Sequence, residues 1–168
     1  VNANTKLIVA KPVKLNDVEG KESFRFDAGY QEVNRVLGGG LVKGSLVLIG
    51  GEPGIGKSTL VLQICDKIAN DDGKVLYVSG EESVEQVKMR ADRLQIHNEN
   101  LMFLGETDMD NIEKEIEKMN PKLVVIDSIQ TMFSSEITSP PGTVSQVREI
   151  TARIMRCCKQ NTVTTILI

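Results

Sequence analysis

The chain has 168 residues, 40% of them apolar, and a formal net charge of −3 at pH 7, which is the composition of one globular domain with a buried core. This charge excludes a surface that is basic throughout, so any contact with nucleic acid has to be local. No apolar run approaches the ~18 residues of a membrane span, so we expect a cytoplasmic protein with no membrane contact. The single histidine and the three cysteines lack zinc-ligand spacing, and no zinc site is predicted.

Both ends of the sequence suggest a piece of a longer protein, because it starts without Met and stops within the apolar run 163–168. Residues 1–23 are polar, are interrupted by Pro and Gly, and predict a linker with one short strand at 6–9. The globular core is expected over residues 24–168.

Two short elements precede the first core strand. Residues 24–26 predict a strand, and residues 31–37 predict a short helix that ends at three successive glycines. The apolar residues 46–49 suit a buried strand, and apolar residues recur at helical spacing from Leu60 to Ile68. Between them lies the loop Gly51-Glu52-Pro53-Gly54-Ile55-Gly56-Lys57-Ser58-Thr59.

This loop has the spacing Gly-x-x-x-x-Gly-Lys-Ser of a phosphate-binding loop. Its glycines let successive backbone N–H groups turn toward a phosphate chain, and the helix that starts near Lys57 directs its positive end at the same anion. Lys57 supplies a mobile charge for the β- and γ-phosphates, and the Ser58 hydroxyl is short enough to reach a bridging Mg²⁺. A turn that only joins a strand to a helix is the alternative, but the complete pattern in its required context favours phosphate binding.

The rest of the chain alternates between strands and helices. Apolar strands are predicted at 74–78, 101–104 and 123–127, and helices at 83–94 and 108–119. The first of these helices opens with the capping box Ser83-x-x-Gln86, and its inward-facing residues are predicted to be Val84, Val87, Ala91 and Leu94. Continuous apolar strands that alternate with helices indicate a parallel sheet covered on both faces, hence an open α/β fold.

Acidic residues follow two of these strands. Asp127 ends an apolar strand, where a buried charge needs a partner; we assign that partner as the Mg²⁺ shell shared with Ser58, and capping of the following residues is the alternative. Glu81 and Glu82 follow the second strand, on the edge where ligands of open α/β sheets collect. We assign Glu81, which directly follows the strand, as the base for the attacking water; the alternative is that both acids only favour the dipole of the next helix.

Several longer strings resemble one known family. They are Leu37-Gly38-Gly39-Gly40-Leu41, residues 48–58, residues 77–83, Arg90-Ala91-Asp92-Arg93-Leu94, residues 125–131 and residues 141–149. Together they resemble the bacterial RadA (Sms) DNA-repair ATPases, within the RecA-like P-loop ATPase superfamily, from about residue 24 to the end.

The resemblance implies an ATPase that uses ATP and Mg²⁺, binds single-stranded and branched DNA, and promotes branch migration alongside the RecA recombinase. It implies a homohexameric ring and a mobile DNA-facing loop at residues 132–144. The family's four-cysteine zinc finger and its segments beyond the fifth strand are missing from this sequence. We therefore expect these residues to bind nucleotide without turning it over or forming rings by themselves.

Thr143-x-x-Gln146 predicts a capping box for a further helix. Its inward-facing residues are predicted to be Val147, Ile150, Ile154, Met155 and Cys158, with the basic residues Arg148, Arg153, Arg156 and Lys159 outside. The basic residues either contact DNA or form a solvated face.

By resemblance to the RecA-like core, the strand order is third, second, fourth, fifth, first. Residues 163–168 then insert between the strand that ends at Asp127 and the strand at 46–49, which is left as an open edge able to pair with another chain. Two other functions compete with the DNA-repair motor. One is a hexameric replicative-type helicase or clock-type RecA-like ATPase, which the string at 141–149 disfavours, and the other is a nucleotide-gated assembly module without turnover.

Overall fold

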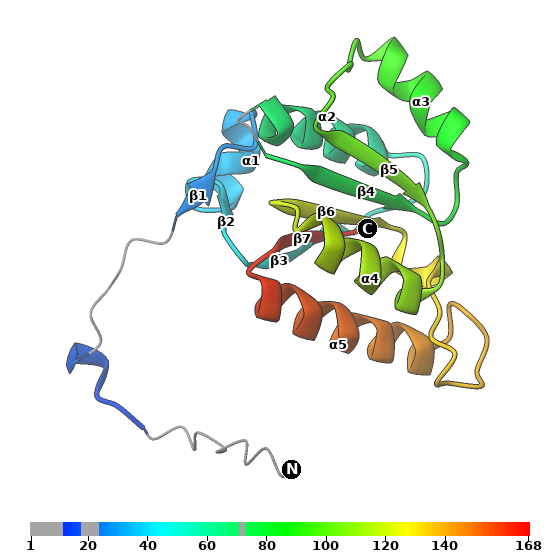
Figure 1. Cartoon of the computed structure of the whole chain (residues 1–168). Helices are drawn as coiled ribbons and strands as arrows, with labels where there is room; N and C mark the ends of the chain where they lie inside the picture. Colours follow the sequence, from blue (N-terminus) through cyan, green and yellow to red (C-terminus); the bar gives the residue numbers. More distant parts are fainter. Residues whose placement is uncertain (1–11, 18–23, 71–72) are drawn as a thin grey trace.

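A computed structural model describes residues 12–17, 24–70 and 73–168 (Figure 1). The strand expected at 6–9 lies outside the described residues. Within the expected linker, Leu15–Asp17 forms a short 3₁₀ helix, η1.

The centre of the molecule is a five-stranded parallel sheet. Its strands are β3 (Leu46–Leu48), β4 (Val75–Ser79), β5 (Leu101–Gly105), β6 (Leu123–Asp127) and β7 (Thr164–Leu167). They lie in the order β3-β7-β6-β4-β5, with every neighbouring pair parallel. The predicted fold class and strand order are therefore confirmed, including the insertion of β7 between β6 and β3.

Helices cover both faces of this sheet (Figure 1). The α-helices of the described residues are α1 (Gln31–Val36), α2 (Lys57–Asn70), α3 (Val84–Arg93), α4 (Met109–Met119) and α5 (Val144–Asn161). α1 lies beside a small antiparallel pair, β1 (Arg25–Phe26) and β2 (Leu41–Val42), rather than on the five-stranded sheet. The buried side chains of α2 pack on one face, and those of α4 and α5 pack on the other.

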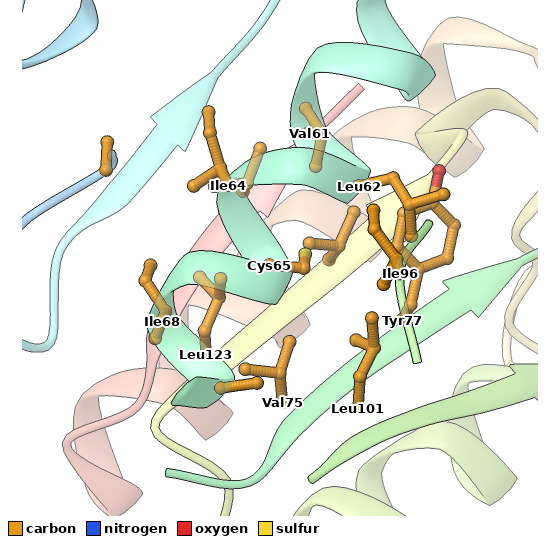
Figure 2. Packing of buried hydrophobic residues seen from close by; sticks show 14 of the residues in the cluster. Val61, Leu62, Ile64, Cys65, Ile68, Val75, Tyr77, Ile96, Leu101 and Leu123 are labelled. Carbon is orange, nitrogen blue, oxygen red and sulfur yellow. The ribbon is translucent and has the colours of Figure 1, made fainter. Parts of the chain in front are cut away.

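Alternate residues of the strands supply the two cores. Val75 and Tyr77 of β4 belong to the cluster beneath α2, whereas Leu76 and Val78 belong to the cluster beneath α4 and α5. Figure 2 shows the first cluster, in which Ile64, Cys65 and Ile68 of α2 lie over strand residues that include Val75 and Leu123. Because both faces are buried, β4 and β6 carry the continuous apolar sequences that make them recognisable.

The helix boundaries follow local chemistry. Ser83 and Gln86 form the predicted capping box at the start of α3. Thr143 caps α5 as expected, but the Gln146 side chain does not return to Thr143: it bonds instead to the loop at 134–139.

Two residues predicted to face inward are exposed. Val84 is the first residue of α3 and is 43% exposed, although its side chain lies near Gly105, the last residue of β5. Met155 is 41% exposed because the buried stripe of α5 runs through Ile150, Ile154 and Cys158, so the next position around the helix turns to solvent. Within the three described ranges, no helix has both the length and the apolar character that crossing a membrane requires.

Candidate functional site

The glycine-rich loop joins β3 to α2 at the carboxyl edge of the sheet. Gly54 has a φ of 78° and Gly56 a φ of 103°, in the region where a side chain is strained. Space is not the constraint, since a Cβ added at either position meets nothing within 4 Å. The glycines at these positions are therefore required by the path of the backbone.

Lys57 is the first residue of α2, and its side chain turns back along the loop. Its Nζ donates hydrogen bonds to the carbonyl oxygens of Gly51 at 2.7 Å and Glu52 at 2.8 Å. The loop, the ammonium and the positive end of a 14-residue helix are thus gathered at one place, and all three favour an anion.

Hydrogen bonds through β7 bring Asp127 to the same edge. The N–H of Ile49 donates to the carbonyl oxygen of Leu167 at 2.8 Å, and the N–H of Ile168 donates to the carbonyl oxygen of Ile126 at 3.0 Å. The N–H of Ile129 donates in turn to the carbonyl oxygen of Ile168 at 2.9 Å. The loop that follows β3 and the carboxylate that ends β6 are therefore separated by one strand.

Asp127 is buried, with 6% exposure, and has a phenol as its neighbour. The Tyr77 hydroxyl donates to Asp127 Oδ2 at 2.5 Å. Burial, followed by the charge of Asp127 and this hydrogen bond, raises the pKa of Tyr77 above its ordinary value, so the phenol stays a donor. The side chain of Asp127 makes no capping bond to the 3₁₀ helix η2 (Ile129–Thr131), whose N-cap Ser128 has no side-chain cap bond either.

The two glutamates after β4 have different surroundings. Glu81 is exposed, and its Oε1 accepts a hydrogen bond from Ser128 Oγ at 2.5 Å, directly beside Asp127. Glu82 instead forms a part-buried ion pair with Arg90 of α3. The structure therefore brings Glu81, rather than Glu82, to the end of β6.

The turn between β4 and Glu81 is tightly packed. A Cβ on Gly80 would lie 2.2 Å from Thr131 Oγ1, so only glycine fits here. The N–H of Gly80 also donates to the Asp127 carbonyl at 2.8 Å, which ties the two strand ends together. A cavity of about 310 Å³ opens beside this turn, lined by Glu81 and Glu106 but by none of the residues 51–59.

The donor set at this edge fits a hard cation with a phosphate chain. Asp127 supplies a buried carboxylate that needs a charge partner, and Ser58 supplies a hydroxyl on the first turn of α2. Oxygen ligands of these two kinds, beside a loop that favours anions, are those that Mg²⁺ takes with a nucleotide. The predicted site residues 51–59, Glu81 and Asp127 all lie at the carboxyl edge of the sheet.

Tyr77 and Ser128 have no role in the sequence-based predictions. The available signal is the phenol itself, because a polar group within an otherwise apolar buried strand requires a hydrogen-bond partner. Ser128 carries no comparable signal, since its contact with Glu81 joins residues 47 positions apart.

The predicted basic face of α5 is partly wrong. Arg153 is buried, with 8% exposure, and its guanidinium binds Glu113, Asp110 and Ser134. Arg153 follows buried Ile150 by three residues and precedes buried Cys157 by four, so it lies on the inner side of α5, where two carboxylates of α4 bind it. The pKa of Asp110 is lowered, chiefly because its carboxylate accepts a hydrogen bond from Arg153.

The segment expected to be a mobile loop is held by α5 at its start. Met132 and Ser134 are buried. The Gln146 side-chain amide accepts from the Ser134 N–H at 3.1 Å and donates to the Ser139 carbonyl at 2.7 Å. The exposed part of the segment is thereby reduced to about residues 135–143.

Comparison with known proteins agrees with this geometry. The family described as AAA domain matches residues 10–168. The DNA repair protein RadA of Bacillus subtilis (strain 168) is 57% identical over 151 residues, or 90% of this chain and 33% of that protein. The protein of the same name from Halalkalibacterium halodurans is 55% identical over the same shares, and that of Chlamydia trachomatis serovar D is 52% identical over 94% of this chain and 35% of that protein.

The chain thus spans about a third of the length of these relatives. The resemblance seen in its sequence strings is confirmed, and the matched region contains the glycine-rich loop and both strand-end carboxylates. The chain belongs to the AAA domain family, whose members are P-loop ATPase domains.

Proposed function

We propose that the chain is the ATPase core of a cytoplasmic DNA-repair protein that hydrolyses Mg-ATP to move branched DNA during recombination. The observation that carries this proposal is the placement of a phosphate-binding loop, a buried Asp127 and an exposed Glu81 on one sheet edge. The similarity to proteins named DNA repair protein RadA supports the biological role.

The residues divide the work as follows. Backbone N–H groups of residues 51–59 and the Lys57 ammonium bind the β- and γ-phosphates. Ser58 and Asp127 would hold Mg²⁺, which when bound would neutralise negative charge on the phosphates. Glu81 accepts a proton from the water that attacks the γ-phosphate, and its bond to Ser128 orients the carboxylate.

Single-stranded DNA is the proposed partner of the exposed segment 135–143 and of the neighbouring helix. Arg148 and Lys159 of α5 are exposed, whereas Arg156 is 62% exposed and pairs with Glu149 at 3.4 Å. These cations offer a small local surface for phosphates on a chain whose net charge is −3. A homo-oligomeric ring and cooperation with RecA complete the proposal.

The main alternative is an assembly module in which ATP joins neighbouring subunits without turnover. The hydrogen bond between Glu81 and Ser128 supports the motor, because it holds Glu81, the proposed base, beside the proposed metal ligand Asp127. A helicase or clock-type ATPase would use the same nucleotide site and differs in its nucleic-acid partner.

Phosphate release by the full-length protein, with and without single-stranded DNA, tests the proposal. Hydrolysis that DNA stimulates is the expected result. Lys57→Ala should abolish it, because the phosphate loop then lacks its charge. Nucleotide binding without hydrolysis would support the assembly module, and undiminished hydrolysis by Lys57→Ala would refute the assigned site.

A further inference from the structure

A buried phenol lies against the carboxylate at the end of β6. Tyr77 has 0% exposure, yet its hydroxyl donates to Asp127 Oδ2 at 2.5 Å. A polar group placed this deep in an apolar cluster needs such a bond, and most buried positions of the cluster are filled by purely apolar side chains. Packing of the ring alone therefore does not explain why this position carries a hydroxyl.

The sheet register explains how the phenol reaches its acceptor. Tyr77 pairs with Val125, and Asp127 lies two residues further along β6, on the same face. The Tyr77 side chain extends along that face toward the carboxyl edge. Figure 2 shows its oxygen at the end of the ring that points away from Leu101.

The ring itself is fixed by its neighbours. It packs against Phe103 of β5, with ring centroids 5.6 Å apart at 56°, and lies in the cluster beneath α2 with Leu62 and Ile96. A ring held by strand and helix neighbours has little freedom to turn. Its hydroxyl thus offers Asp127 a donor in one fixed place.

We propose that Tyr77 is a positioning residue for the metal site: its hydroxyl holds Oδ2 of Asp127 and so fixes the orientation of the carboxylate that would bind Mg²⁺. The inference rests on the proposed function. The Tyr77 hydroxyl acts through Asp127 and touches neither metal nor nucleotide. Groups that orient a metal-binding side chain in this way are commonly worth about 10- to 100-fold in metal affinity.

Tyr77→Phe tests this assignment, because it removes the hydroxyl and keeps the ring. Binding of a fluorescent ADP analogue to the 168-residue chain is measured against Mg²⁺ concentration and again in EDTA. The variant should need about 10-fold more Mg²⁺ for the same binding, with its affinity in EDTA unchanged. Tyr30→Phe is the matched control, since Tyr30 is 37% exposed and its side chain makes no cap bond to α1.

A purely structural hydroxyl gives a different result. Tyr77→Phe would then melt at a lower temperature but bind Mg-ADP with the wild-type Mg²⁺ dependence, which overturns the inference. In a protein that already carries Asp127→Asn, adding Tyr77→Phe should not change the Mg²⁺ dependence of binding further, because Tyr77 acts on the metal only through the Asp127 carboxylate. If the wild-type chain bound no Mg-ADP at all, the proposed function itself would fail.

A second measurement needs no substitution at Tyr77. The chain has 2 tyrosines, so labelling with 3-fluorotyrosine gives two ¹⁹F resonances, which Tyr30→Phe assigns. Adding Mg²⁺ to the ADP-bound chain should shift the Tyr77 resonance and leave that of Tyr30 in place. If the chain binds Mg-ADP but the chemical shift of the Tyr77 resonance does not change when Mg²⁺ is added, the inference is overturned. This holds even if Tyr77→Phe fails to fold.

Discussion

At the scale of single residues, two side chains that are equivalent in the sequence differ in their contacts in the folded chain. Glu81 and Glu82 are adjacent and both follow β4. Glu82 is held by Arg90, whereas Glu81 is exposed and bonded to Ser128 beside Asp127. Glu82 therefore anchors α3, whereas Glu81 stays exposed beside Asp127, as the proposed catalytic base requires.

Glu81→Gln keeps the shape of the side chain and removes the base. We expect the full-length protein to bind ATP as before, with turnover lowered by roughly 10²-fold or more. Steady-state phosphate release and nucleotide binding, measured together, separate the two effects. Glu82→Gln is the matched control and should retain most activity; the opposite pattern would assign the base to Glu82.

Arg153 shows that charge alone does not put a side chain on the outer face of a helix. It lies three residues after buried Ile150 on α5, and carboxylates of Asp110 and Glu113 on α4 bind it where the two helices meet. A buried cation is tolerated when its hydrogen bonds are satisfied. The partners come from another helix, so no local pattern in α5 announces them.

Arg153→Met should lower the free energy of unfolding by about 2 kcal/mol at pH 7, because it leaves two carboxylates without their partner. Arg153 depresses the folded pKa of Asp110, so the part of the stabilisation that comes from this one pair is complete above the unfolded pKa of Asp110 and is lost as pH falls through its folded pKa. Urea unfolding should therefore show a smaller difference near pH 3. Arg156→Met is the control and should cost little, because its ion pair is exposed; equal losses for both variants would contradict the argument.

At the scale of elements, boundaries are set by caps. α4 and α5 both end at a residue in the left-handed conformation, Asn120 with φ of 45° and Thr162 with φ of 54°. Asparagine tolerates this region, whereas a β-branched residue is strained there. The two helices thus end with the same backbone geometry, but the conformational strain is greater at Thr162 than at Asn120.

Thr162→Gly should relieve that strain and raise the free energy of unfolding by about 1 kcal/mol. Chemical denaturation at pH 7 measures the gain. Asn120→Gly, the matched control at the other left-handed cap, should gain less. A loss of stability in Thr162→Gly would show that contacts of the threonine side chain outweigh the strain of its backbone.

The elements also show how far the sequence alone leads. The buried strands β4 and β6 are apolar throughout, so their existence and the acid at the end of β6 could be predicted from composition. The loop at 51–59 could be predicted because its chemistry is local. The contacts of Tyr77 and Gln146 could not, because each joins segments that only the folded sheet brings together.

At the scale of the whole molecule, β7 completes the sheet. It hydrogen-bonds to β3 on one side and to β6 on the other. Among the described strands, β3 has no other neighbour in the sheet, so the strand that carries the phosphate-binding loop is held in the sheet through β7.

Thr165→Pro tests this dependence. The Thr165 N–H donates to the Ser45 carbonyl at 2.9 Å, so proline removes that bond within a central strand and should cost about 3 kcal/mol or more. We expect loss of cooperative unfolding and of nucleotide binding. Val144→Pro is the control, because the first position of a helix after an extended residue accepts proline; a folded, nucleotide-binding Thr165→Pro would contradict the central role of β7.

The position of β7 also decides what a ribosome exposes during synthesis. A bond between the Gly44 N–H and Thr164 Oγ1 joins residues 120 positions apart. At about 5–20 residues per second, those positions are made about 6–24 s apart. During that interval β3 and its glycine-rich loop have been synthesised without the strand that holds them, so the candidate nucleotide site is among the last parts of this chain to be completed.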